Sequence, residues 1–139
     1  MELQYTKVQT LQPVLATQIN ELKKALSLYQ QEGFLGAILF GSCALGNATY
    51  RSDIDIFLIF AIEKLDFSFV SSIRENVDGF FEKINKREML EQPLPVEFQV
   101  VRETVFLTSE SEIKKNLKSG IILVDNSGRL GRQIREINE

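Results

Sequence analysis

Two acidic residues at the start of an apolar segment are the side chains best placed for chemistry. Asp53 and Asp55 are separated by one residue and open the apolar run 56–60, which predicts a buried strand. Because side chains alternate between the two faces of a strand, both carboxylates would point the same way, with Cα atoms roughly 7 Å apart. Paired carboxylates attract hard divalent cations, and Mg²⁺ completes its ligand shell with water and substrate phosphates. A pair of such ions can bridge the attacking and leaving oxygens of a phosphoryl or nucleotidyl transfer.

A second short motif, Gly41-Ser42, ends the preceding apolar run, 36–40, which predicts another buried strand. Ten residues separate Ser42 from Asp53. A glycine lets the backbone approach a phosphate closely, and Ser42 is placed to cap a short helix over 42–46, whose N-terminal amides would favour an anion. A triphosphate on one side and a metal ion on the other is the arrangement that nucleotidyl transfer needs.

Together the two motifs resemble the signature of the DNA polymerase beta nucleotidyltransferase superfamily, and the fuller pattern is similar to that of its minimal nucleotidyltransferase (MNT) branch. In this chain the pattern consists of Gly41, Ser42, Ala44, Gly46, Ser52, Asp53, Ile54 and Asp55. The resemblance implies that Asp53 and Asp55 bind Mg²⁺ or Mn²⁺, that ATP is the nucleotide donor, and that Gly41 and Ser42 hold its triphosphate. A tight loop between two core strands, with no chemical role, is the structural alternative.

A third acidic residue, Glu97, lies in the alternating segment 96–101. Val96, Phe98 and Val100 would face the core there, and Glu97 would face the open side. The superfamily often carries its third acidic residue, usually an aspartate, on such a strand. The resemblance therefore implies that Glu97 completes the metal site or helps to deprotonate an acceptor hydroxyl. An exposed glutamate on an edge strand is the alternative.

The signature departs from the family's pattern at Leu45, where the family commonly carries an arginine. An arginine would supply a positive, forked contact to phosphate, which leucine cannot make. Arg51 and Ser52, next to the acidic motif, are the remaining candidates to contact the nucleotide. The departure leaves a pseudoenzyme open as an alternative to an active enzyme.

The composition excludes several kinds of active site. The 139 residues include no histidine, which excludes Ser-His-Asp and Cys-His nucleophilic systems and histidine-ligated zinc. The single cysteine, Cys43, cannot form an internal disulfide, and without a histidine base it is expected to be a small buried residue. The net charge of −3 argues against an extended nucleic acid as substrate. No signal peptide or membrane-spanning run is visible, so we expect a cytoplasmic protein.

The apolar runs and the helical segments between them predict an α/β (α+β) fold. We expect a small mixed β-sheet of about four strands with helices packed mainly on one face, which is the nucleotidyltransferase fold that the resemblance implies. Apolar residues that recur at intervals of three and four residues predict helices over 14–31 and 68–90. Pro13 is expected to open the first of these helices. A final helix followed by a short strand over 121–124 completes the predicted sheet.

The length predicts one nucleotidyltransferase domain over 1–139, with a core of about 14–125 and a polar tail or exposed helix over 126–139. In the second strand Phe57 and Ile59 would share the face of the two aspartates. Few predicted elements remain to cover them, so we expect shielding by the N-terminal residues, by the C-terminal residues or by another chain.

The resemblance favours a metal-dependent nucleotidyltransferase that transfers AMP from ATP to a hydroxyl of a partner protein, because MNT proteins commonly act as antitoxins of HEPN-domain toxins. One alternative is a non-catalytic protein of the same fold that neutralises a partner by binding. Another is a small-molecule (antibiotic) nucleotidyltransferase. The expected partners are a nucleoside triphosphate and either a helical HEPN-type protein or a second copy of the chain.

Overall fold

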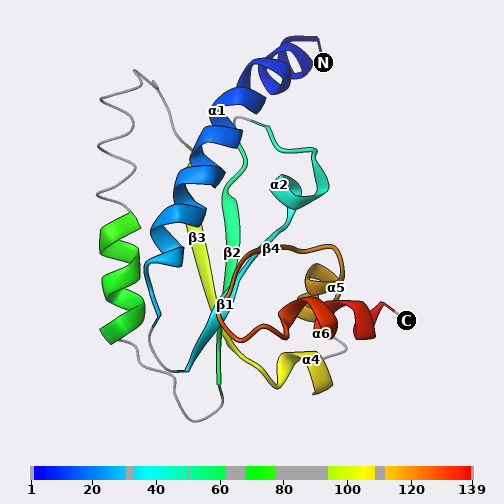
Figure 1. Cartoon of the computed structure of the whole chain (residues 1–139). Coiled ribbons are helices and arrows are strands. Elements are labelled where there is room, and N and C mark those ends of the chain that lie inside the picture. Colours follow the sequence, from blue (N-terminus) through cyan, green and yellow to red (C-terminus); the bar gives the residue numbers. More distant parts are fainter. Residues whose placement is uncertain are drawn as a thin grey trace.

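The computed structural model describes residues 2–30, 33–49, 51–61, 68–77, 94–108 and 112–138, arranged as Figure 1 shows. The elements follow one another as α1 (Glu2–Ser27), β1 (Phe34–Phe40), α2 (Ser42–Leu45), β2 (Ile54–Phe60), a helix over 68–77, β3 (Val96–Arg102), α4 (Val105–Thr108), α5 (Glu112–Lys118), β4 (Ile121–Asp125) and α6 (Leu130–Ile137). All four strands lie where the apolar runs predict them. The later part of the helix expected over 68–90 lies outside the described residues.

The four strands form one mixed sheet in the order β3-β2-β1-β4, which confirms the predicted fold class. β1 is antiparallel to β2 and to β4, whereas β2 and β3 are parallel. The C-terminal end of β1 and the N-terminal ends of the other strands therefore meet at one end of the sheet. Asp55 is paired there with Phe40 on one side and with Glu97 on the other.

One face of the sheet is covered by α1 and by the helix over 68–77 (Figure 1). Leu22 of α1 and Ile56 of β2 belong to this core cluster, and both are fully buried. A buried side chain, Gln18, ties α1 to the segment before β3. Its Nε2 donates to the Leu94 carbonyl at 3.3 Å, and its Oε1 accepts from the Leu94 amide at 3.1 Å.

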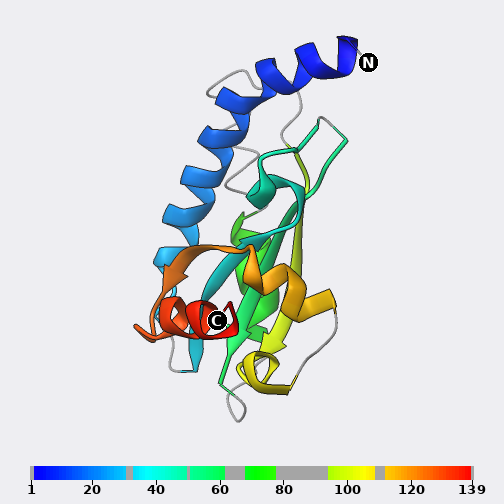
Figure 2. The same ribbon diagram turned by 90° about the vertical axis from the view of Figure 1, so that its right-hand side faces the viewer.

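Helix α1 begins at Glu2, so the prediction that Pro13 opens it is wrong. A proline inside a helix removes one backbone hydrogen bond and crowds the preceding turn, which can bend the helix without ending it. In Figure 2 the axis of α1 bends in the N-terminal part of the helix.

The second face of the sheet is covered by three shorter helices, α4, α5 and α6 (Figures 1 and 2). Phe57 and Ile59 are fully buried on this face. They share a cluster with one residue from each covering helix, namely Phe106, Leu117 and Leu130. Shielding by another chain is therefore not needed, because the C-terminal half of the protein supplies the cover. Helices thus lie on both faces, with the longer two on the first.

Residues 126–139, expected to be a polar tail or an exposed helix, include the helix α6, but this helix is packed against the sheet. Leu130 is fully buried, and Ile134 and Ile137 are partly buried in the same cluster. Their spacing of four and three residues places them on one helical stripe, which outweighs the polar composition of the segment. Within the described part of the chain, no helix has the length and apolar character needed to cross a membrane.

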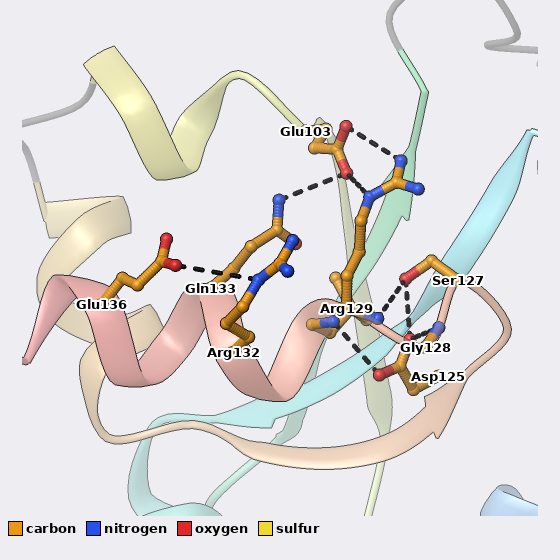
Figure 3. A network of polar contacts seen from close by, with 9 residues as sticks. Glu103, Asp125, Ser127, Gly128, Arg129, Arg132, Gln133 and Glu136 are labelled. Carbon is orange, nitrogen blue, oxygen red and sulfur yellow. Dashed lines mark hydrogen bonds and ion pairs between the residues drawn. The ribbon is translucent and has the colours of Figure 1, made fainter.

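A polar network fixes α6 at the end of the sheet opposite the acidic motif (Figure 3). Glu103, just after β3, accepts hydrogen bonds from Nε and Nη2 of Arg129 at 2.8 and 3.1 Å. The hydrogen bond from Arg129 lowers the pKa of Glu103 below its ordinary value. Asp125 accepts from the Gly128 amide at 2.8 Å and from the Leu130 amide at 3.1 Å, which satisfies amides at the start of the helix. The network therefore joins the ends of β3 and β4 to α6.

Candidate active site

Three carboxylates lie at the end of the sheet where β1 finishes and β2 begins. Asp53 directly precedes β2, and Asp55 is the second residue of that strand. Glu97 is the second residue of β3 and is paired with Asp55 in the parallel ladder, where adjacent strands lie about 4.8 Å apart. Asp53 and Glu97 are exposed, and Asp55 is half-buried. The structure therefore brings the three predicted acidic residues to one end of two neighbouring strands.

The Asp55 carboxyl lies in a cluster of acidic side chains. Partial burial raises the pKa of its carboxyl above the ordinary value, and the negative charges of Asp53 and Glu97 raise it further. Among the described residues, no cation is one of the causes of this shift. A divalent cation bound here would relieve the repulsion between the carboxylates.

Gly41 leaves the space that the Asp55 carboxylate occupies. Its backbone has φ 75° and ψ −154°, a conformation that residues other than glycine rarely adopt. A Cβ built on Gly41 would lie 2.6 Å from Oδ2 of Asp55, well inside contact distance. The glycine of the first motif is thus packed directly against the second aspartate of the acidic motif, which joins the two motifs into one site.

Ser42 is the first residue of α2, and Gly41 occupies the N-cap position without a side-chain capping hydrogen bond. The prediction that Ser42 caps this helix is therefore wrong, although the short helix itself is confirmed. Because the cap position falls on a glycine, no hydroxyl is available there, and the Ser42 side chain lies half-buried inside the first turn. Its role as a contact for phosphate stays a prediction.

Cys43, also in α2, is buried beside the acidic motif. Its Sγ lies 3.5 Å from the carbonyl oxygen of Asp53. Burial raises the pKa of the Cys43 thiol to about 11, and the charges of Asp55 and Asp53 add to this effect. The thiol is therefore protonated at neutral pH and is not a nucleophile, which agrees with its predicted place in the core.

The other residues considered for nucleotide contact lie at the end of α2 and in the connection between α2 and β2. Leu45 is the last residue of α2 and is 61% exposed, so an apolar side chain faces solvent where the family's arginine is expected. Arg51 is exposed and Ser52 is half-buried, and both lie in the turn that leads to Asp53. The hydroxyl of Ser52 accepts a hydrogen bond from the amide of Thr49 within this turn.

The carboxylates of Asp53, Asp55 and Glu97 are suitable ligands for a hard cation, but they do not form a complete metal site by themselves. Among the described residues, no three histidine, cysteine, aspartate or glutamate side chains are arranged to hold a metal ion by themselves. Carboxylate oxygens are nevertheless the ligands that Mg²⁺ and Mn²⁺ prefer, and Mg²⁺ commonly keeps water and substrate phosphates as its other ligands. Asp53, Asp55 and Glu97 therefore fit such an ion when a nucleotide supplies further oxygens.

Two contacts at the site were not predicted from the sequence, namely the hydrogen bond between Thr49 and Ser52 and the contact of Cys43 with Asp53. Thr49 and Ser52 are three residues apart between α2 and β2, and this spacing of hydroxyl residues is typical of a side-chain-stabilised turn. The sequence therefore held a signal for this turn. The contact of Cys43 with the Asp53 carbonyl depends on how α2 packs against β2, and no sequence pattern indicates it.

Comparisons with known proteins show the family to which this chain belongs. The sequence pattern of the family "Polymerase beta, Nucleotidyltransferase" matches residues 20–113. The chain is similar to a crystal structure of a toxin-antitoxin with AMP-PNP, at 16% sequence identity and a TM-score of 0.49, over 86% of this chain and 83% of that chain. It is also similar to a crystal structure of a mutant of the toxin-antitoxin MntA-HpeT, at 14% identity and a TM-score of 0.48, over 86% of this chain and 83% of that chain. A comparison with curated proteins found no match. Because the family pattern covers more than half of the chain and spans both motifs and Glu97, the chain belongs to the polymerase beta nucleotidyltransferase family.

Proposed function

We propose that this protein is a metal-dependent nucleotidyltransferase that transfers AMP from ATP to a hydroxyl of a partner protein. One observation carries the proposal: Asp53, Asp55 and Glu97 lie together beside the Gly41-Ser42 loop in a chain of this family. Burial raises the pKa of Asp55, and the charges of Asp53 and Glu97 raise it further, so the ionised Asp55 would be stabilised by a ligand that brings positive charge. A nucleotide bound with a metal ion would bring that charge.

Each residue has a distinct part in the proposal. Asp53 and Asp55 hold Mg²⁺ or Mn²⁺, and Glu97 completes the site or accepts the proton of the acceptor hydroxyl. When bound, the metal supplies positive charge to the oxygens of the reacting phosphate. In this proposal the backbone of Gly41 and Ser42 holds the triphosphate.

The proposed transfer forms one phosphorus–oxygen bond and breaks another. The acceptor hydroxyl oxygen bonds to the α-phosphorus of ATP, and the bond from that phosphorus to the oxygen bridging to the β-phosphate breaks. Pyrophosphate leaves, and the hydroxyl proton passes to a carboxylate, which we propose to be that of Glu97, an exposed residue paired with Asp55. The reaction needs no covalent intermediate on the protein, which suits a chain without histidine and with a protonated Cys43.

The acceptor is proposed to be a HEPN-type toxin, since the pattern from Gly41 to Asp55 resembles that of MNT antitoxins. The face of the sheet beneath α4, α5 and α6 is already covered by these helices, so a partner is not proposed to bind that sheet face. A partner would instead approach the open end of the sheet, where Asp53 and Glu97 are exposed. Its hydroxyl would then meet the carboxylates directly.

Leu45 favours a second candidate function, that of a non-catalytic protein which neutralises its partner by binding. The side chain is 61% exposed and apolar beside the proposed triphosphate site, where it adds contact area for a protein but no charge for a phosphate. Nucleotide binding without transfer would distinguish this candidate from the enzyme.

The test is label transfer from ATP to the protein encoded by the neighbouring gene. With ATP labelled at the α-phosphate and Mg²⁺ present, we expect label on the partner, whereas ATP labelled at the γ-phosphate should leave it unlabelled. The double variant Asp53→Asn with Asp55→Asn should lose transfer, and Glu112→Gln, which changes an exposed carboxylate on α5, should keep it. Undiminished labelling by the double variant would refute the enzymatic proposal, and ATP binding without any labelling would favour the non-catalytic candidate.

A further inference from the structure

The turn that precedes the acidic motif is closed by its own side chains. The Thr49 amide donates to Oγ of Ser52 at 2.8 Å, and the Ser52 amide donates to the Thr49 carbonyl at 2.9 Å. The Arg51 amide donates to Oγ1 of Thr49 at 3.2 Å. These hydrogen bonds hold Thr49, Arg51 and Ser52 close together in a turn, and Ser52 is bonded covalently to Asp53.

Asp53 depends on this turn more than Asp55 does. The strand pairing of β2 begins at Ile54, so Asp53 lies just outside the ladder that holds Asp55. After Asp53, the Ile54 amide donates to the carbonyl of Pro95 at 2.8 Å. The direction of the Asp53 side chain is therefore set by the start of the strand on one side and by the Ser52 turn on the other.

We infer that Ser52 is a positioning residue for Asp53. Its hydroxyl oxygen fixes the turn and so brings the Asp53 carboxylate alongside that of Asp55, and its effect on the reaction passes through this carboxylate. The inference rests on the proposed function, because it concerns how the two carboxylates share a divalent cation. Loss of the hydroxyl would leave the Thr49 amide without its partner in the turn, which would let the backbone before Asp53 vary.

The experiment measures Mn²⁺ binding to the full chain by electron paramagnetic resonance, first without nucleotide and then with a saturating non-hydrolysable ATP analogue. Ser52→Ala removes the acceptor oxygen, and Ser52→Thr keeps it. We expect Ser52→Ala to weaken Mn²⁺ binding about tenfold, the lower end of what loss of an outer partner of a metal ligand costs. Ser52→Thr should stay within about twofold of the unchanged protein. Ser72→Ala, an exposed serine on the helix over 68–77, is the matched control and should change nothing.

A second readout separates positioning from direct contact with the nucleotide. If Ser52 acts through Asp53, the same variant raises the Mn²⁺ concentration needed for half-maximal transfer and leaves the KM for ATP at saturating metal near its original value. A raised KM for ATP with unchanged Mn²⁺ binding would overturn the inference. If Ser52→Ala does not fold, Ser52→Cys, which keeps the shape but is a weaker acceptor, must show the same direction of change.

The outcomes distinguish this inference from the proposed function. If the unchanged protein binds Mn²⁺ and Ser52→Ala binds it equally well, the inference fails while the proposed function stands. If the unchanged protein does not bind Mn²⁺ at millimolar concentrations, with or without ATP, both fail.

Discussion

Replacing Gly41 by alanine should damage the site far more than its cost in stability suggests. The backbone of Gly41, at φ 75° and ψ −154°, lies in a region that is nearly closed to other residues, so the strain costs about 1–3 kcal/mol. In a domain of this size each kcal/mol corresponds to roughly 3–5 °C in the unfolding midpoint. The new Cβ would also lie 2.6 Å from Oδ2 of Asp55, so this carboxylate must move away from its place beside Glu97.

Gly46 provides the matched control, because it has a similar φ of 79° but an added Cβ would meet no atom within 4 Å. Gly46→Ala should therefore cost about 1–2 kcal/mol of backbone strain and leave the carboxylates in place. We expect both variants to unfold at lower temperature by circular dichroism, and Gly41→Ala in addition to bind Mn²⁺ at least tenfold more weakly by electron paramagnetic resonance. Equal Mn²⁺ affinity in the two variants would refute the argument that Gly41 makes room for Asp55.

Three further predictions concern titrating groups. The pKa of Asp55 is raised in the folded protein. Its contribution to stability is therefore present at pH values below the ordinary pKa of an aspartate, and it is lost as the pH rises through the raised pKa. Asp55→Asn should therefore stabilise the protein at pH 7 by up to about 1 kcal/mol, since solvent screens the repulsion, and urea unfolding measures this gain. The pKa of Glu103 is lowered by the hydrogen bond from Arg129. The contribution of Glu103 to stability is therefore present at pH values above the ordinary pKa of a glutamate, and it is lost as the pH falls through the lowered pKa. Glu103→Gln should cost about 1 kcal/mol at pH 7 and little near pH 2, and an equal loss at both pH values would contradict the ion pair. With its pKa raised to about 11, Cys43 should react with iodoacetamide at pH 8 roughly two hundred times more slowly than a free thiol, and urea-unfolded protein is the control.

The strands were predictable because each is an apolar run or a clean alternation bounded by polar residues or glycine, and burial in a sheet requires just such patterns. α6 was misjudged because its arginines dominate the composition. Its apolar stripe of Leu130, Ile134 and Ile137 is short, and its burial depends on contacts with residues distant in the chain, such as Ile59 and Phe106. The start of α1 was misplaced because Pro13 is also compatible with the interior of a bent helix.

The candidate site was predictable in its membership but not in its internal contacts. Alternation along a strand places Asp53 and Asp55 on one face, and the alternating segment around Glu97 indicates a third acidic position. The register that pairs Glu97 with Asp55 is a property of the parallel ladder, which no local pattern specifies. The packing of Gly41 against Asp55 likewise depends on how two antiparallel strands align at their ends.

The acidic residues at the two ends of β3 lie in different electrostatic environments. At one end Glu103 is held by two hydrogen bonds from Arg129, whereas at the other Glu97 adds its charge to those of Asp53 and Asp55. Under the proposed function, the positive charge that balances this acidic cluster arrives with a ligand. Such a ligand must stabilise the fold, by about 2.7 kcal/mol at a concentration one hundred times its Kd. Mg²⁺ with a non-hydrolysable ATP analogue should therefore raise the unfolding temperature of the unchanged protein but not that of Asp53→Asn with Asp55→Asn, and an equal rise in both would place the binding elsewhere.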